Sequence, residues 1–310
     1  MVHSKAFDGL NGNFPIGFLV WDISKKEVLN EIETTALDKD ARFVGLKQFH
    51  SSPANTHLNN LMPRLKTNAL SIPLKNAIHP QLSHAKVTAW VDGAIGYLWS
   101  AGNDPQQTAT HTALFSSVFS NGCGFYLTPE NLWQAAIVFS VRRLIKPTWL
   151  NDRDQFLQPS APLTNEFKTD CLIWMLFNGS NLSAGANGLE WNDKKWSIVN
   201  HFIPFTENEV GAKDRFESNF MSNYLAKLKP SAEAKAVFDE GREVWRAYHA
   251  KSFERKIRDE FKLNRSDVGW YQIRKALEAE GEFDFSPFKF AFEKLSVKLR
   301  PQVFELGFLR

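Results

Sequence analysis

The order of the predicted elements constrains the fold of this chain more than any other feature. Strand and turn patterns fill its first third, the middle mixes strands with helices, and only helix patterns follow Pro230. Strands followed by helices indicate an α+β protein, because α/β folds alternate the two along the chain. We therefore predict a mixed sheet-and-helix body over residues 1–230 and an all-helical C-terminal segment over residues 231–310.

The strand predictions rest on apolar runs and turn residues. Residues 16–23 are almost continuously apolar, which predicts a strand buried on both faces. Residues 26–33 and 42–49 are its expected partners. Further along, Asp92-Gly93 lies between two strand patterns and predicts a β-hairpin over residues 84–100.

Capping residues predict where the helices begin. Thr128 before Pro129 predicts a helix that ends near Ile145, and a second is expected from Thr164 to Gly179. A strand is expected over residues 196–203. Thr206 and Glu209 then have the spacing of a capping box. Three helices of the C-terminal segment are predicted to begin at Ser231, which opens a long helix to about Arg258, at Ser266, and at Ser286-Pro287.

Composition favours a folded protein of the cytoplasm. The chain is 43% hydrophobic and contains 26 phenylalanines and 10 tryptophans, enough to build a large core. Cys123 and Cys171 are too few for a disulfide framework, so we expect reduced thiols. The apolar run over residues 171–177 is far shorter than a membrane span, and residues 1–7 lack the apolar region of a secretory signal.

Positive charge is concentrated in the middle of the chain. The net charge is +3 overall and +4 over residues 61–150, whereas residues 151–230 carry −2. A weakly basic region is compatible with a surface that faces phosphate groups.

Six stretches resemble a known family. Residues 14–22 (Phe-Pro-Ile-Gly-Phe-Leu-Val-Trp-Asp) are similar to a late catalytic-domain strand of N6-adenine DNA methyltransferase-like proteins of restriction–modification systems. The region downstream of that domain resembles residues 149–156, 169–181, 200–205, 267–273 and 305–309. This family uses S-adenosylmethionine, bound at a glycine-rich motif, and grips a flipped base with a Pro-Pro-aromatic loop.

The chain departs from that family at both motifs. It contains no two adjacent prolines, and its one glycine pattern, residues 7–12, follows too few residues to be preceded by the required strand. We therefore expect a simple turn there and no cofactor in this chain. The resemblance implies a DNA-recognition fragment or subunit without methyltransferase activity of its own, whose partners are DNA and a separate catalytic chain.

Basic and aromatic residues supply candidate DNA contacts. They are the helix-end cations Arg142, Arg143 and Lys146, the loop residues Trp191, Lys194, Lys195 and Trp196, and the amide Asn200. Each has a structural alternative. The cations complement a helix dipole, the tryptophans fold onto the core from a hairpin, and Asn200 pairs with His201 inside the protein.

Two other functions remain open from the sequence. Asp152 or Asp154, followed by Glu166 and Lys168, has the form of a Mg²⁺-dependent nuclease site. That site needs strand edges, whereas Glu166 and Lys168 are expected in the first turn of a helix. The other alternative is a non-catalytic protein-interaction subunit. The scattered histidines lack the spacing of metal ligands, so no metal site is predicted.

Overall fold

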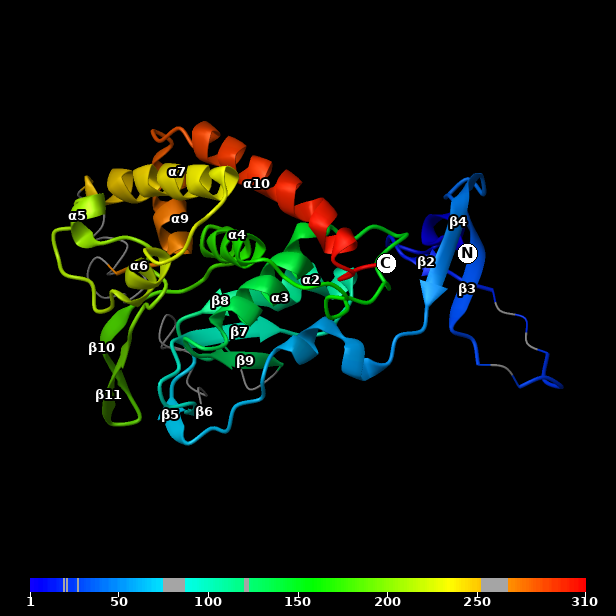
Figure 1. Cartoon of the computed structure of the whole chain (residues 1–310), viewed down its shortest axis with the longest axis horizontal. Coiled ribbons are helices and arrows are strands. Elements are labelled where there is room, and N and C mark those ends of the chain that lie inside the picture. Colours follow the sequence, from blue (N-terminus) through cyan, green and yellow to red (C-terminus); the bar gives the residue numbers. More distant parts are fainter. Residues whose placement is uncertain (19, 21, 27, 75–86, 120–122, 252–266) are drawn as a thin grey trace.

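A computed structural model describes residues 1–18, 20, 22–26, 28–74, 87–119, 123–251 and 267–310 (Figure 1). It confirms the α+β prediction. Small sheets and helices make up the body, and within the described ranges every regular element after Pro230 is a helix. The described helices include none with the length and hydropathy that a bilayer span requires.

The N-terminal residues form a four-stranded sheet that stands apart from the rest of the chain in Figure 1. The C-terminal end of the chain lies on the side of the body that faces this sheet. The strands of the sheet are β1 (Val2–His3), β2 (Pro15–Ile16), β3 (Glu31–Leu37) and β4 (Phe43–His50), in the order β2-β1-β3-β4. Lys47 of β4 joins it to the body through an ion pair with Asp154, 2.6 Å long. His3 adds an edge-on contact to Trp149, with the rings 5.1 Å apart.

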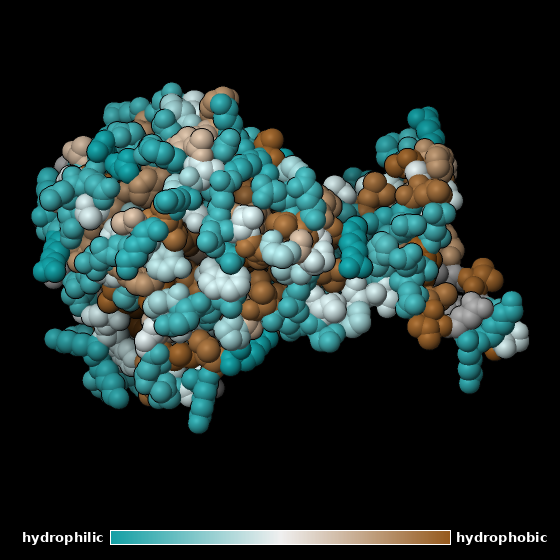
Figure 2. Space-filling model, viewed as in Figure 1, coloured by the Kyte–Doolittle hydropathy of each residue, from teal (hydrophilic) through white to brown (hydrophobic). Residues whose placement is uncertain are grey.

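The strand predicted over residues 16–23 is wrong. Strand β2 ends at Ile16, and Phe18, Val20 and Ile23 are 74%, 98% and 97% exposed. An apolar run becomes a buried strand only when layers cover both of its faces, and no described element covers this one. Figure 2 shows hydrophobic side chains gathered on this protruding part of the molecule. Residues 26–33 and 42–49 were expected to pair with that strand, but β2 pairs with β1, and β3 and β4 pair with each other.

The body contains a three-stranded antiparallel sheet in the order β8-β7-β9. Its strands are β7 (Gly96–Ser100), β8 (Thr112–Phe115) and β9 (Gly124–Leu127), with helix α2 (Pro105–His111) before β8. A separate pair consists of β5 (Ala69–Ser71) and β6 (Thr88–Trp90). Three short 3-10 helices cover Ser4–Ala6, Ala54–Thr56 and Leu58–Leu61.

The hairpin predicted over residues 84–100 is also wrong. Gly93 does turn the chain, with φ +75°, but β6 pairs with β5, and β7 pairs with β8 and β9. The turn residues are a local signal, whereas the choice of partner strand depends on segments elsewhere in the chain.

Two buried helices lie over this sheet: α3 packs against it, and α4 packs against α3 (Figure 1). Helix α3 covers Leu132–Leu144 and α4 covers Asn165–Leu176. Thr164 caps α4 as predicted, because its hydroxyl accepts a hydrogen bond from the Phe167 amide. Helix α3 begins later than predicted: the Asn131 side chain accepts from the Thr128 amide and closes a turn over that stretch.

A hairpin and five helices complete the described chain. The hairpin consists of β10 (Ala186–Trp191) and β11 (Lys194–Ile198), so the strand predicted to Ile203 ends earlier. The helices are α5 (Glu207–Val210), α6 (Phe220–Leu225), α7 (Ala232–His249), α9 (Trp270–Glu280) and α10 (Ser286–Glu305). The Thr206–Glu209 capping box and the Ser231 cap are confirmed. Helix α7 ends at His249, earlier than the predicted end near Arg258, and the predicted start at Ser266 lies outside the described residues.

One hydrophobic core extends from Leu58 to Leu309. It includes residues from both sides of Pro230, so the change of composition there marks a change of secondary structure within a shared core. Helix α10, the last helix of the chain, packs against α7, α4 and α3 and covers one side of this core (Figure 1).

Candidate nucleic-acid interface

The cations predicted at the end of α3 do not share one environment. Arg142 is fully buried and donates hydrogen bonds to the Ser100 hydroxyl, at 2.6 Å, and to the Ala101 carbonyl, at 2.7 Å. Burial lowers the pKa of its guanidinium to about 10, although Asp104 opposes the shift. The prediction that Arg142 contacts phosphate is therefore wrong, because its charge is used inside the protein.

The two cations that follow Arg142 are more accessible. Arg143 is partly exposed but donates to the Thr112 carbonyl at 3.0 Å, and burial lowers its pKa. Lys146 is exposed beyond the helix end. Of the three predicted helix-end contacts, Lys146 thus has the most accessible charge.

The predicted aromatic–basic loop is the tip of the β10–β11 hairpin. Lys194 and Lys195 are exposed, and Lys195 lies opposite Glu190 in the strand register. Trp191 and Trp196 are half-buried and meet edge-on, with ring centroids 6.3 Å apart, and both pack against the core. The tryptophans therefore fold onto the core from a hairpin, which is the structural alternative to base contact. The lysines remain exposed near the tip, where they can contact phosphates.

Asn200 is buried, which contradicts its prediction as a base contact. Its side-chain carbonyl accepts a hydrogen bond from the Phe202 amide at 3.1 Å, and the residue is 1% exposed. His201 does not pair with it and instead meets the Ser218 hydroxyl at 2.8 Å.

The four residues of the nuclease alternative each have a separate environment. Asp154 is bound to Lys47, Glu166 to Lys298 at 2.8 Å, and Lys168 lies over the ring of Trp133. Among the described residues, no three acidic, histidine or cysteine side chains are grouped to hold a metal ion.

Asp152 is buried, and neither of its carboxylate oxygens has a hydrogen-bond partner among the described residues. Burial raises its pKa, while Arg153, 3.9 Å away, opposes the shift. Asp154 and Lys168 line different cavities. The structure therefore does not assemble the acid–lysine set into one site.

The feature that best fits an anionic ligand is a cavity that we call the lysine pocket. Its volume is about 450 Å³, and it lies between α4 and the chain from α6 to Pro230. The lining residues are Trp133, Asn165, Lys168, Thr169, Leu172, Tyr224, Lys227, Leu228 and Lys229. Three of them are cationic and none is acidic, so the pocket concentrates positive charge.

The three lysines of this pocket have no acidic partner among the described residues. Lys227 and Lys229 are exposed, and Lys168 is partly buried with its ammonium 4.8 Å from the ring centroid of Trp133. Lys298, by contrast, is held by Asp170, Glu166 and Glu233 at 2.9, 2.8 and 3.6 Å. These ion pairs hold Lys298 in place, whereas the cations of the lysine pocket remain available to a ligand.

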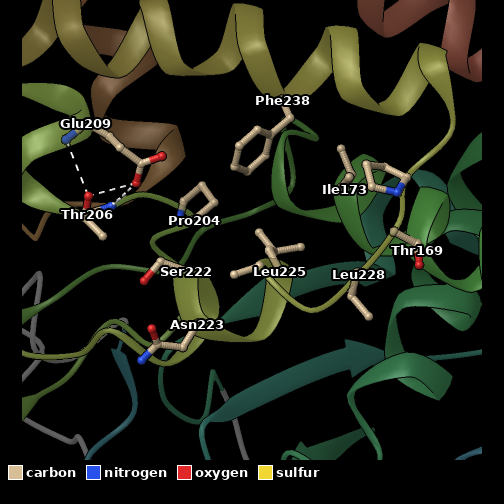
Figure 3. A pocket seen from close by; sticks show the side chains of 12 residues that line it. Thr169, Ile173, Pro204, Thr206, Glu209, Ser222, Asn223, Leu225, Leu228 and Phe238 are labelled. Atoms are coloured by element: carbon tan, nitrogen blue, oxygen red, sulfur yellow. Dashed lines mark hydrogen bonds between the residues drawn. The ribbon is translucent and has the colours of Figure 1, made fainter.

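A second cavity of about 300 Å³ adjoins the lysine pocket, and we call it the apolar pocket (Figure 3). Thr169 and Leu228 line both cavities. In Figure 3, Phe238, Ile173 and Leu225 project into it, while Thr206 and Glu209 form their capping box at one side. Together, the two cavities flank the stretch from Leu225 to Leu228.

Sequence reasoning missed most of the lysine pocket. The sequence pattern assigns Lys168 to the nuclease alternative, and it gives no role to Trp133, which lies within the helix predicted to end near Ile145. A signal was present in the short run Lys227-Leu-Lys229 after Tyr224, which combines alternating lysines with an aromatic residue. Trp133 lies more than ninety positions earlier in the chain, so its place beside that run requires the fold.

The glycine pattern over residues 7–12 is a turn, as predicted. It connects a 3-10 helix to strand β2, and Gly9 adopts φ +80°. A phosphate-binding turn leads from a strand into a helix whose N-terminus receives the phosphate, and this segment leads into a strand. Its residues do not fit the adenosyl cofactor of the resembled family.

Comparisons with protein-family models, curated proteins and solved structures found no match to this chain. The chemistry of the two adjoining pockets is therefore the basis for assigning a function.

Proposed function

We propose that this protein binds DNA, as a recognition subunit without a catalytic centre of its own, in an adenine-methyltransferase-like restriction–modification system. The resemblance of residues 149–156 and 169–181 to the recognition region of that family supports the choice of DNA and of a separate catalytic chain as partners. The composition of the lysine pocket supports binding of a polyanion.

The observation that carries the proposal is a cavity with two aromatic side chains and three lysines that have no acidic partner in the described part of the chain. Lys168, Lys227 and Lys229 line the cavity together with Trp133 and Tyr224, and no acidic residue is among the described residues that line it. Ammonium groups attract phosphates and aromatic rings stack on bases, so this combination matches the two recurring parts of a nucleic acid. Lys146, Lys194 and Lys195 extend the proposal as further phosphate contacts on exposed surface.

The test is binding of fluorescein-labelled DNA, measured by anisotropy at several salt concentrations. If the three pocket lysines contact phosphates, a rise from about 50 to about 200 mM salt weakens binding roughly 20- to 40-fold, because counterions are released on binding. Replacing Lys227 or Lys229 by alanine lowers the salt slope by about one unit for each phosphate that is no longer neutralised. Lys25→Ala, a change of an exposed lysine on the N-terminal part, is the matched control and leaves the slope unchanged.

Affinity that is independent of both salt and the pocket lysines would contradict the proposal. In that case the interaction-subunit alternative becomes the next one to test, by size-exclusion chromatography with candidate catalytic chains. None of the contacts around Asp152, Asp154, Glu166 and Lys168 favours the nuclease alternative.

A further inference from the structure

We propose that the lysine pocket holds one unpaired nucleotide of a DNA strand, with its base against the aromatic wall and its phosphate at the lysines. The inference rests on the proposed function and narrows it, because it states that the pocket prefers single-stranded DNA to duplex DNA.

The shape of the site argues for an unpaired base. The lysine pocket is a recess of about 450 Å³ with two aromatic side chains, Trp133 and Tyr224, in its wall. Cavities of this size take small ligands or single building blocks of polymers. Stacking on an aromatic ring requires a free base face, and in a duplex both faces of an interior base are covered by its neighbours.

The polar groups of the pocket suit the rest of a nucleotide. The Lys168 ammonium lies over one face of the Trp133 ring, 4.8 Å from its centroid, so a base that stacks on this ring must use the other face or displace the ammonium. Lys227 and Lys229, on the chain that follows α6, add two more cations to the lining. Asn165 offers both a donor and acceptors to a base edge. The Tyr224 hydroxyl, which also lines the pocket, can donate or accept a hydrogen bond.

The adjoining apolar pocket indicates a strand and not a free nucleotide. It shares Thr169 and Leu228 with the lysine pocket and adds a wall of Ile173, Leu225 and Phe238 (Figure 3). A second base of the same strand fits such a wall, because apolar surface binds base faces without reading their identity. We therefore expect a strand to bind more tightly than a mononucleotide does.

The decisive experiment separates base stacking from charge. Anisotropy titrations compare three labelled ligands: an oligothymidylate of about 12 nucleotides, a duplex of about the same length, and an abasic oligomer with the same backbone. The abasic oligomer has the same phosphates without bases, so it is a control that needs no change to the protein. Unlabelled thymidine monophosphate serves as competitor.

We expect the oligothymidylate to bind about ten-fold more tightly than either the duplex or the abasic oligomer, the size of one stacking contact. Trp133→Leu or Tyr224→Leu should reduce that advantage while the salt slope is retained. Circular dichroism melts of both variants verify that they are folded, and either variant alone suffices if the other does not fold.

The possible outcomes distinguish the two proposals. Equal binding of all three ligands, with affinity reduced in Lys227→Ala and Lys229→Ala, would overturn the unpaired-nucleotide inference and leave DNA binding standing. Binding that depends neither on salt nor on any pocket lysine would overturn both. An advantage of the oligothymidylate that depends on Trp133 or Tyr224 would support both.

Discussion

Replacing Arg142 by methionine should destabilise the protein and leave its affinity for DNA unchanged. This arginine lies at the end of a helix, where cations often contact phosphates, yet its side chain is fully buried. Methionine is also long and unbranched, so the change removes the charge and its hydrogen bonds while it retains most of the buried apolar volume.

The size of the effect follows from the hydrogen bonds that the guanidinium makes. Arg142 donates two short charge-assisted hydrogen bonds, at 2.6 and 2.7 Å, and each bond of this type contributes about 1.5–3 kcal/mol. The Ser100 hydroxyl still donates to Asn59 at 2.9 Å after the change. The Ala101 carbonyl loses its guanidinium donor, and buried Asp104 loses the nearby positive charge that opposes its own.

Removing the charge also has a favourable effect, because the guanidinium no longer has to lose its hydration when the protein folds. This effect partly offsets the loss of the hydrogen bonds. Removing one partner of a buried charged network typically costs about 3–5 kcal/mol. We therefore expect the free energy of unfolding to fall by about 3 kcal/mol for Arg142→Met.

The assay pairs this variant with Lys227→Met, which makes the same chemical change at an exposed site of the lysine pocket. Urea denaturation followed by circular dichroism measures stability, and anisotropy measures affinity at a temperature where both variants are folded. Arg142→Met should alter only stability, and Lys227→Met only affinity. If Arg142→Met kept its stability and lost DNA affinity by about ten-fold or more, the burial argument would be refuted.

Three further substitutions test the packing, a cap and the pH dependence. Gly241→Ala in α7 places a methyl group 2.2 Å from a ring carbon of buried Phe177, so the urea midpoint should fall by the equivalent of about 1–2 kcal/mol. Thr206→Ala removes one half of the capping box with Glu209 and should cost about 1 kcal/mol, measured by thermal unfolding. Asp152→Asn should stabilise the protein at neutral pH: burial raises the pKa of Asp152 above its ordinary 3.8, so wild-type stability declines as the pH rises from that value through the folded-state pKa. The advantage of the variant should therefore disappear in acid, and denaturation at pH about 3 and about 7 measures the difference.

Helix starts were the most predictable part of the fold. The caps at Thr164, Thr206 and Ser231 were predicted correctly, because each needs only a hydroxyl and a backbone amide three residues later. The Thr128 prediction failed for a reason that is also local. Asn131 accepts the Thr128 amide and holds the chain in a turn, so the helix begins after it.

Burial and strand pairing were less predictable, because both depend on distant residues. The sequence around Arg142 does not show that Ser100 and Ala101, some forty positions earlier, receive its hydrogen bonds. Asp92-Gly93 likewise indicates a turn but not that β8 and β9 occupy both edges of β7. The lysine pocket likewise depends on distant residues, since α3, α4, α6 and the chain after α6 all contribute to it.

Helix α4 explains why an acid and a lysine so close in sequence do not act together. Glu166 and Lys168 are two positions apart, and positions two apart on an α-helix are separated by about 200° around its axis. Glu166 accordingly joins Asp170, four positions along, in binding Lys298 of α10. Lys168 lies on the side of Trp133 and the lysine pocket. The spacing that resembles a nuclease motif thus places the acid in a structural ion-pair network and directs the lysine to the cavity, where its charge remains available to bind a phosphate.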